Sequence, residues 1–170
     1  ITEIKQKMYL QEEKIMVNNL FRILIFLIIM ISCNEKKLID KFKDFDQRGW
    51  ISNTPSIFNF STKDLDYITN VSLRIKYDIE YPYQNLYYNF NILDSIDTIV
   101  KKELNEMILF DEINGKPLGS GISKTFILDE KIIENLTLKK NSSFSIHIYQ
   151  KMREKNLIGI KSIGVLVKKN

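Results

Sequence analysis

The amino-acid sequence predicts an all-β domain, an antiparallel β-sandwich of jelly-roll or immunoglobulin-like form, preceded by an N-terminal signal helix. Three observations lead to this prediction. Several segments after residue 49 alternate apolar and polar side chains, which is the period of a strand with one buried face. Turn-forming residues separate these segments at intervals of about eight to fifteen residues, without alternating helices. A short apolar run, residues 23–32, stands apart near the N-terminus.

The clearest predicted strand covers residues 71–80, where apolar side chains alternate with polar or charged ones. A turn at residues 81–83 leads into a second strand, because a proline between two tyrosines interrupts the alternation. In that second strand the residues with one shared, buried face are Leu86, Tyr88, Phe90 and Ile92.

The rest of the domain is read in the same way. Residues 98–110 alternate less regularly and are assigned to a strand, with a helical turn around residues 101–107 as the alternative. Residues 125–138 mix short apolar runs with charges and receive no assignment. The other predicted strands are residues 57–61, 144–151 and 163–167.

The apolar run is typical of a secretory signal. Arg22 precedes it and a charged segment follows it, whereas a bilayer-spanning helix needs roughly 20 apolar residues. The run ends at Ser32 and Cys33, and a cysteine after a small residue is where bacterial lipoprotein signals are cut and acylated. The alternatives are an ordinary signal peptide with a coincidental cysteine, or a signal anchor that is not cut.

These features divide the chain into three parts. Residues 1–32 are predicted to be a signal peptide with sequence upstream of the true start. That start is Met16, which puts residues 1–15 upstream, or alternatively Met8. Residues 33–48 are predicted to be a lipidated tether, although apolar spacing also fits a short helix. Residues 49–170 are the predicted β-sandwich.

Composition excludes several classes of function. Residues 33–170 hold 21 basic and 18 acidic side chains, spread along the chain, so we expect no nucleic-acid binding. Cys33 is the only cysteine, and a domain that follows it folds without disulfides. His147 is the only histidine, so no cluster of cysteine and histidine predicts a metal site, and we expect no cofactor.

No motif predicts an enzyme either. The serines at residues 142–143 lack the frame of a nucleophile elbow. Gly119, Ser120 and Gly121 lack the lysine and the strand-to-helix context of a phosphate-binding loop.

Three aromatic residues are candidates for binding or for structure. Trp50, the only tryptophan, is expected to cap one end of the core, with a ligand-stacking role as the alternative. Tyr81 and Tyr83 lie in a predicted turn, where exposed tyrosines contact sugars or protein partners. The alternative for these tyrosines is that they cover the edge of the sheet.

Several short motifs, taken in order, resemble the GldH family of gliding-motility lipoproteins from the Bacteroidetes. They are Cys33, the loop with Leu118, Gly119 and Gly121, the pair Met152 and Arg153, and the glycine-containing segments 157–160 and 163–165. The resemblance covers residues 33–168. This chain departs from the family in having Pro117 where a tryptophan often stands, and in a loose lipobox before Cys33.

The resemblance implies a function. Cys33 would be the lipid anchor, and Leu118, Gly119, Gly121, Met152 and Arg153 a shared structural or contact surface, with glycines for a tight turn and Arg153 hydrogen-bonding the next loop. The protein would be a non-enzymatic structural or assembly component of the gliding apparatus. It would lie in the cell envelope, on the periplasmic face or the cell surface, with the membrane and other gliding or envelope proteins as partners. The alternative is a surface lipoprotein that binds glycan.

Overall fold

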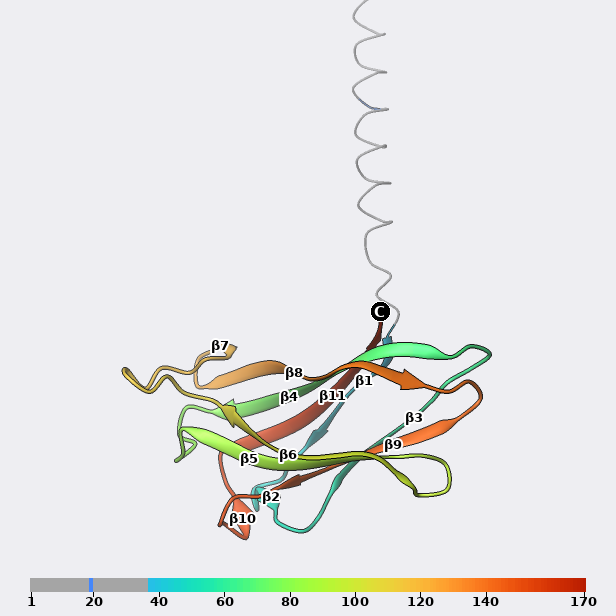
Figure 1. The fold of residues 1–170 in the computed structure, drawn as a ribbon. Helices are drawn as coiled ribbons and strands as arrows, with labels where there is room; N and C mark the ends of the chain where they lie inside the picture. Colours follow the sequence, from blue (N-terminus) through green and yellow to red (C-terminus); the bar gives the residue numbers. More distant parts are fainter. Residues whose placement is uncertain (1–18, 20–36) are drawn as a thin grey trace, which may run out of the picture. The chain divides into compact units, whose positions relative to one another are not determined.

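A computed structural model describes Asn19 and residues 37–170. The predicted signal helix and Cys33 lie outside the described residues. Within the described part, no helix is long and apolar enough to cross a bilayer. Residues 37–170 form eleven strands (Figure 1): β1 (Lys37–Asp44), β2 (Trp50–Ile51), β3 (Ser56–Ser61), β4 (Tyr67–Asp78), β5 (Asn85–Leu93), β6 (Ile99–Ile108), β7 (Ser120–Ile122), β8 (Thr125–Leu138), β9 (Ser143–Gln150), β10 (Asn156–Leu157) and β11 (Ile160–Lys169).

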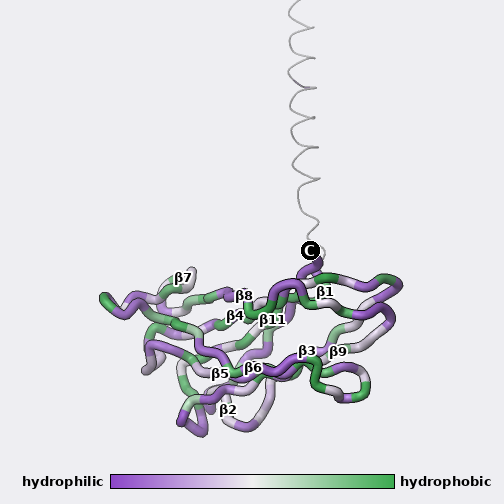
Figure 2. Tube along the Cα trace, viewed as in Figure 1, coloured by the Kyte–Doolittle hydropathy of each residue, from purple (hydrophilic) through white to green (hydrophobic). Residues whose placement is uncertain are grey.

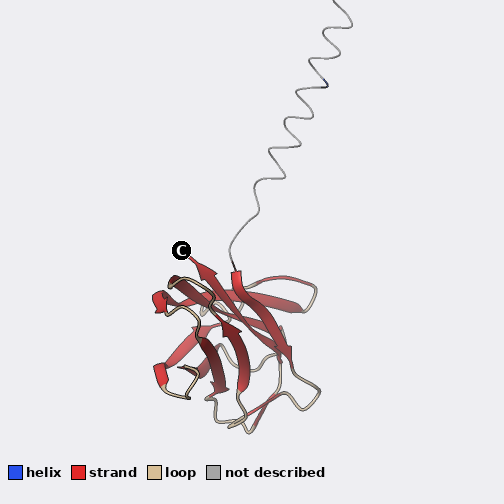
Figure 3. Ribbon diagram, turned by 90° about the vertical axis from the view of Figure 1, so that its right-hand side faces the viewer, coloured by secondary structure: helices blue, strands red, loops and turns tan. Residues whose placement is uncertain are grey.

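The chain folds as one antiparallel ribbon whose first half pairs with its second half. β1 pairs with β11, β2 with β10, β3 with β9, β4 with β8, and β5 with β6. Wrapping the ribbon brings β4 beside β11 and β5 beside β9. The resulting sheets have the orders β1-β11-β4-β8-β7 and β3-β9-β5-β6. Figure 3 shows that the described domain consists of strands joined by loops. This wrapped ribbon is the jelly-roll form of the predicted sandwich.

The core lies between the two sheets and is built by the predicted alternation. Along β4, every second residue from Val71 to Tyr77 is fully buried, and its neighbours are partly exposed. The predicted buried face of β5 is confirmed in the same way. Residues 99–108 form β6, so the strand assignment there is confirmed over the helical turn. The all-β prediction is therefore confirmed.

The first strand corrects the expectation of a tether over residues 33–48. Residues 37–44 form β1, which pairs with β11, so the sandwich begins at Lys37 and not at residue 49. The sequence hides this strand because β1 lies at the edge of its sheet and buries only Ile39. An edge strand that is mostly exposed needs few apolar residues, and charges on it discourage pairing with other molecules.

The unassigned segment 125–138 is also a strand, β8, of 14 residues. Its pairing with β4 shifts register twice, around Val71. Each shift moves the following side chains to the other face of the sheet, and so the alternation that identifies a strand is interrupted.

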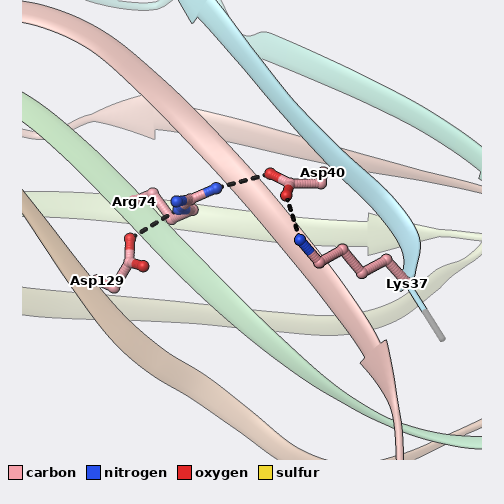
Figure 4. A network of polar contacts seen from close by, with 4 residues as sticks. All are labelled: Lys37, Asp40, Arg74 and Asp129. Atoms are coloured by element: carbon pink, nitrogen blue, oxygen red, sulfur yellow. Dashed lines mark hydrogen bonds and ion pairs between the residues drawn. The ribbon is translucent and has the colours of Figure 1, made fainter. Parts of the chain in front are cut away.

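On its outer face, the five-stranded sheet is held by a network around Arg74 (Figure 4). The Arg74 guanidinium of β4 donates to Asp129 of β8 at 2.8 Å and, across β11, to Asp40 of β1 at 2.6 Å. It also stacks over the ring of Phe42, 4.8 Å from the ring centroid. That ring lies flat on β11 at Gly164, where any Cβ would meet it at 2.7 Å.

The hydrogen bonds that Asp40 receives from Lys37 and Arg74 hold the pKa of its carboxyl below the usual range, with that from Lys37 the larger cause. Exposed ion pairs contribute about 0 to 1 kcal/mol each, so the network chiefly fixes the alignment of β1, β4 and β8.

Most strands run between two ends of the sandwich. The terminal end holds Lys37, Asn170 and the loops at residues 62–66 and 139–142. The other end, named the motif end below, holds the loops at residues 45–55, 79–84, 109–119 and 151–159. β4 has 12 residues and connects the two ends, which at about 3.3 Å per residue separates them by roughly 35 Å.

Because the core lacks disulfides, packing alone stabilises it, and removing a buried side chain is expected to be costly. Leu73 is fully buried in β4, so Leu73→Ala should lower the free energy of unfolding by about 2–5 kcal/mol in urea denaturation. The matched control is Leu65→Ala, since Leu65 is 66% exposed, and its effect should stay within about 0.5 kcal/mol. Equal effects would contradict the described core.

Candidate functional site

The candidate residues from the sequence, apart from Cys33, gather at the motif end. They come from four separate segments of the chain, and the jelly-roll pairing brings the ends of those segments together. These residues are Trp50, Tyr81, Tyr83, Leu118, Gly119, Gly121, Met152 and Arg153.

The two motif glycines allow β7 to lie close against β8. A Cβ on Gly119 would stand 2.6 Å from the carbonyl oxygen of Ile127, and one on Gly121 would clash with the carbonyl of Thr125. Neither glycine has a positive φ, whereas Gly115 in the preceding loop does. The glycines therefore allow close backbone approach, and neither adopts the left-handed conformation that favours glycine.

Tyr77, which the sequence analysis placed only on a buried face, connects this motif to the core. Its hydroxyl donates to the carbonyl of Leu109 at 2.8 Å and accepts the N–H of Gly119 at 3.0 Å. Leu118 N–H donates to the same Leu109 carbonyl at 2.9 Å. The sequence signal for this role is a tyrosine on the buried face of a predicted strand, because a buried hydroxyl needs a hydrogen-bond partner.

Aromatic rings continue from Tyr77 to the turn at residues 81–83. Phe110 packs edge-on against Tyr77 with ring centroids 5.3 Å apart, and Tyr81 stacks on Phe110 at 6.5 Å. Tyr81 then meets Tyr83 edge-on at 5.6 Å. Gly159, with φ of 91°, packs against the other side of Tyr81, where a Cβ would lie 2.8 Å from the Tyr81 Cα. The rings of Tyr77, Phe110 and Tyr81 thus connect the glycine loop to the segment that contains Gly159.

The turn with Met152 and Arg153 is held by the buried Gln150. Its Oε1 accepts the N–H of Met152 at 2.8 Å, and its Nε2 donates to the carbonyl of Glu154 at 2.7 Å. Arg153 is exposed and forms no hydrogen bond or ion pair with any described residue. The expected role of Arg153 in fixing this loop is therefore filled by Gln150, and the guanidinium is left for solvent or a partner.

Trp50 caps the core at the motif end, as expected. It is 1% exposed and stacks on Phe45 at 5.3 Å, and its backbone pairs with Leu157. Its burial excludes the alternative of ligand stacking at an open surface.

The tyrosines do not form an exposed platform at the motif end. Tyr81 is 4% exposed and its hydroxyl donates to the carbonyl of Asn85 at 3.0 Å. Tyr83 is half-buried and its hydroxyl donates to Glu154 at 2.9 Å. A shallow hollow of about 390 Å³ lies beside them, lined also by Asp111 and Glu112.

Exposed aliphatic side chains instead gather in the loops of the motif end. Figure 2 shows hydrophobic residues at the tip of the loop before β7. Ile113 is 95% exposed and Ile122 is 91% exposed. The further exposed members are Ile79, Leu118 and Ile158. With Arg153 they are named the aliphatic tips, a set of exposed apolar side chains and one guanidinium carried by several loops of the motif end.

The pKa values of three tyrosines at this end are raised. Burial raises the pKa of Tyr77. Burial also raises the pKa of Tyr81, and nearby Tyr83 raises it further. The hydrogen bond to Glu154 is the main cause that raises the pKa of Tyr83. These phenols therefore stay protonated at physiological pH. Among residues 37–170 no cluster of three acidic, histidine or cysteine side chains could hold a metal ion.

The described domain is thus a jelly roll whose motif residues build a rigid base for exposed loops. The sequence matches the GldH lipoprotein family over residues 37–167, which is most of the chain. The protein belongs to that family, which confirms the resemblance drawn from Cys33, the glycine loop and the pair Met152 and Arg153. No curated protein matches the chain.

Solved structures with a similar arrangement of strands are distant. A CocE/NonD family hydrolase from Staphylococcus aureus has a TM-score of 0.38 and 8% identity, and the match covers 79% of this chain and 33% of that one. A serine protease of Aeromonas sobria has a TM-score of 0.33 and 9% identity, and the match covers 81% of this chain and 28% of that one. Latent PorU from Porphyromonas gingivalis has a TM-score of 0.30 and 8% identity, and the match covers 82% of this chain and 14% of that one. The chain spans about a third or less of each, and these likenesses carry no argument about its function.

The Tyr77 hydroxyl is expected to contribute to the stability of the motif end. Tyr77→Phe removes two hydrogen bonds and leaves the Gly119 N–H without its partner, so the free energy of unfolding should fall by about 1–3 kcal/mol. Hydrogen exchange at the Gly119 amide should also become faster. Tyr87→Phe is the control, since Tyr87 is 41% exposed, and it should change stability by less than about 0.5 kcal/mol.

Proposed function

We propose that this protein is a lipid-anchored, non-enzymatic component of the gliding-motility apparatus of the cell envelope. In this role it binds a protein partner through the aliphatic tips and acts as a structural or assembly subunit. Membership of the GldH lipoprotein family supports the setting. The observation that supports partner binding is the set of exposed aliphatic side chains, with the unpaired Arg153, on the loops of the motif end.

The composition of this surface suits protein association. Burying exposed isoleucine and leucine contributes roughly 25 cal/mol per Å² of apolar surface removed from water. Arginine is enriched among residues that contribute strongly to protein interfaces, because its planar guanidinium forms several hydrogen bonds at once. The Tyr77 and Gln150 hydrogen bonds hold the bases of the loops, which lowers the entropy lost when a partner binds.

The membrane anchor in this proposal is Cys33. A single acyl chain holds a protein only marginally, whereas two or three chains on one cysteine hold it stably. The motif end lies roughly 35 Å from the end of the domain where the chain continues toward Cys33. A partner surface at that distance is accessible to a large envelope assembly.

Glycan binding is the alternative from the sequence, and the burial of Tyr81 argues against it. Sugar-binding sites use exposed aromatic faces with polar groups between them, whereas the Tyr81 ring is covered by Phe110 and Gly159. The loops of the motif end expose aliphatic side chains instead, which favours a protein partner.

Lipidation can be tested by intact mass of protein extracted from the membrane of a bacterium that matures lipoproteins. We expect a chain that begins at Cys33 and is heavier by two or three acyl groups. Cys33→Ser should lose this mass increase, because serine has no thiol to carry the acyl groups. An unmodified Cys33 in the wild-type protein would remove the anchor from the proposal.

The partner surface can be tested in a gliding bacterium whose own member of this family is deleted. Ile113→Asp with Ile122→Asp should reduce colony spreading and weaken co-purification with envelope proteins at least tenfold, because charges at a buried contact are costly. The matched control is Ile57→Asp with Leu104→Asp, at exposed positions of the edge strands β3 and β6.

Equal spreading of both double variants, at equal membrane abundance and thermal stability, would exclude the aliphatic tips as the partner surface. If the variant with Ile113→Asp and Ile122→Asp loses binding to purified envelope glycan while its co-purification with proteins is unchanged, the glycan alternative is favoured.

A further inference from the structure

A hollow of about 490 Å³ opens at the terminal end, between the edge strands β1 and β3 of the two sheets. Its charged lining consists only of lysines, with no acidic residue among the lining side chains. The uncharged polar groups beside them are Asn59 and Ser61. The four lysines, named the basic corner, are Lys37, Lys41, Lys63 and Lys169.

Protection of a sheet edge does not account for the basic corner. Lysines on an edge strand discourage pairing with other chains, and this explains Lys41 on β1. Lys63, however, lies in the turn after β3, and Lys169 ends β11, which is an inner strand of its sheet. Three elements thus direct cations into one hollow.

Much of this positive charge has no counter-charge in the described domain. Lys41 and Lys63 form no ion pair with any described residue. Lys169 lies over the ring of Tyr67, with its Nζ 3.8 Å from the centroid, and keeps its charge there. Lys37 alone is paired, to Asp40 at 3.0 Å.

The acidic groups nearby are engaged or lie elsewhere. Asp66 pairs with Lys139 at 3.4 Å and accepts the backbone N–H of Lys140. Asp94 and Asp97 line an adjoining hollow, which shares Asn59, Phe60 and Ser61 with the hollow of the basic corner but contains none of its lysines. Asp64 follows Lys63 in the same turn but is not part of the lining of the basic corner. The hollow therefore suits an anion.

The position of the basic corner in the chain indicates which anion. Lys37 is the fourth residue after Cys33, so the two Cα atoms are at most about 14 Å apart. Lipid chains on Cys33 would hold this end of the domain at the polar layer of the membrane. Lysines there lie within about one Debye length, roughly 8 Å, of the charged headgroups.

We propose that the basic corner binds the headgroups of anionic phospholipids in the leaflet that carries the lipid anchor. This inference rests on the proposed anchor at Cys33. Docking the terminal end on the headgroups aligns β4 away from the membrane and presents the aliphatic tips roughly 35 Å from it. The lysines thus orient the domain, and the acyl chains retain it.

Vesicle flotation tests the proposal without the lipid anchor. The polypeptide of residues 33–170 with Cys33→Ser contains every described strand and the whole core. It should bind vesicles of phosphatidylcholine with about one third phosphatidylglycerol, fail to bind pure phosphatidylcholine, and be released as salt rises from about 0.1 M to 0.5 M.

The decisive comparison uses two triple variants of equal charge. Lys41→Gln, Lys63→Gln and Lys169→Gln together should weaken partitioning to the anionic vesicles roughly a hundredfold, at about fivefold per lysine. Lys102→Gln, Lys116→Gln and Lys155→Gln remove three exposed lysines outside the basic corner and should weaken it less than about threefold. Both variants should keep the wild-type melting temperature.

Equal losses in the two triple variants would mean that binding follows net charge, and would overturn the proposal. Equal binding to pure phosphatidylcholine would overturn it as well. Inorganic phosphate that protects the basic corner from lysine acylation, without vesicles, would assign it to a soluble anion instead. None of these outcomes affects the mass of lipidated Cys33, so failure of the basic corner is distinguishable from failure of the anchor.

Discussion

The insertion of the last strand between the first and the fourth is the constraint on which the rest of the structure depends. β11 pairs with β1 on one side and β4 on the other, and Ile163, Val165 and Val167 are fully buried. No cysteine lies in the domain, so this packing must stabilise the sandwich without covalent help. Because β11 begins at Ile160, directly after the motif-end loop, and ends at Lys169, it also places the family-like loops and the described chain ends at opposite ends of the sandwich.

At the motif end, the motif residues fall into two physical roles. Gly119, Gly121, Gly159 and the buried Tyr77 allow or fix close backbone approach, and they make the loops rigid at their bases. The aliphatic tips and Arg153 extend beyond that base into solvent. Exposed apolar side chains on such a base would suit the protein partner proposed above.

The two ends differ in the kind of interaction they offer. The terminal end offers lysine charge with a long-range attraction to anionic surfaces, which salt weakens. The motif end offers apolar contact area that acts only on close approach and is insensitive to salt. A lipid anchor, a charged docking corner and an apolar partner surface along one axis would let an envelope subunit bind its membrane and its partner at the same time.

The sequence by itself determined the β-rich class, most strands, the buried face of β4 and β5, and the family, because alternation and motif order are local properties of the chain. It missed β1, where only Ile39 is buried, and it obscured β8, where register shifts break the alternation. Tertiary structure alone decided that Tyr81 is buried, that Gln150 and not Arg153 holds the neighbouring turn, and that Lys41, Lys63 and Lys169 share one hollow. The shared hollow depends on β1 and β11, which pair across more than a hundred residues, and Tyr81 is covered by Phe110 and Gly159 from distant segments. Local alternation carries no record of such contacts.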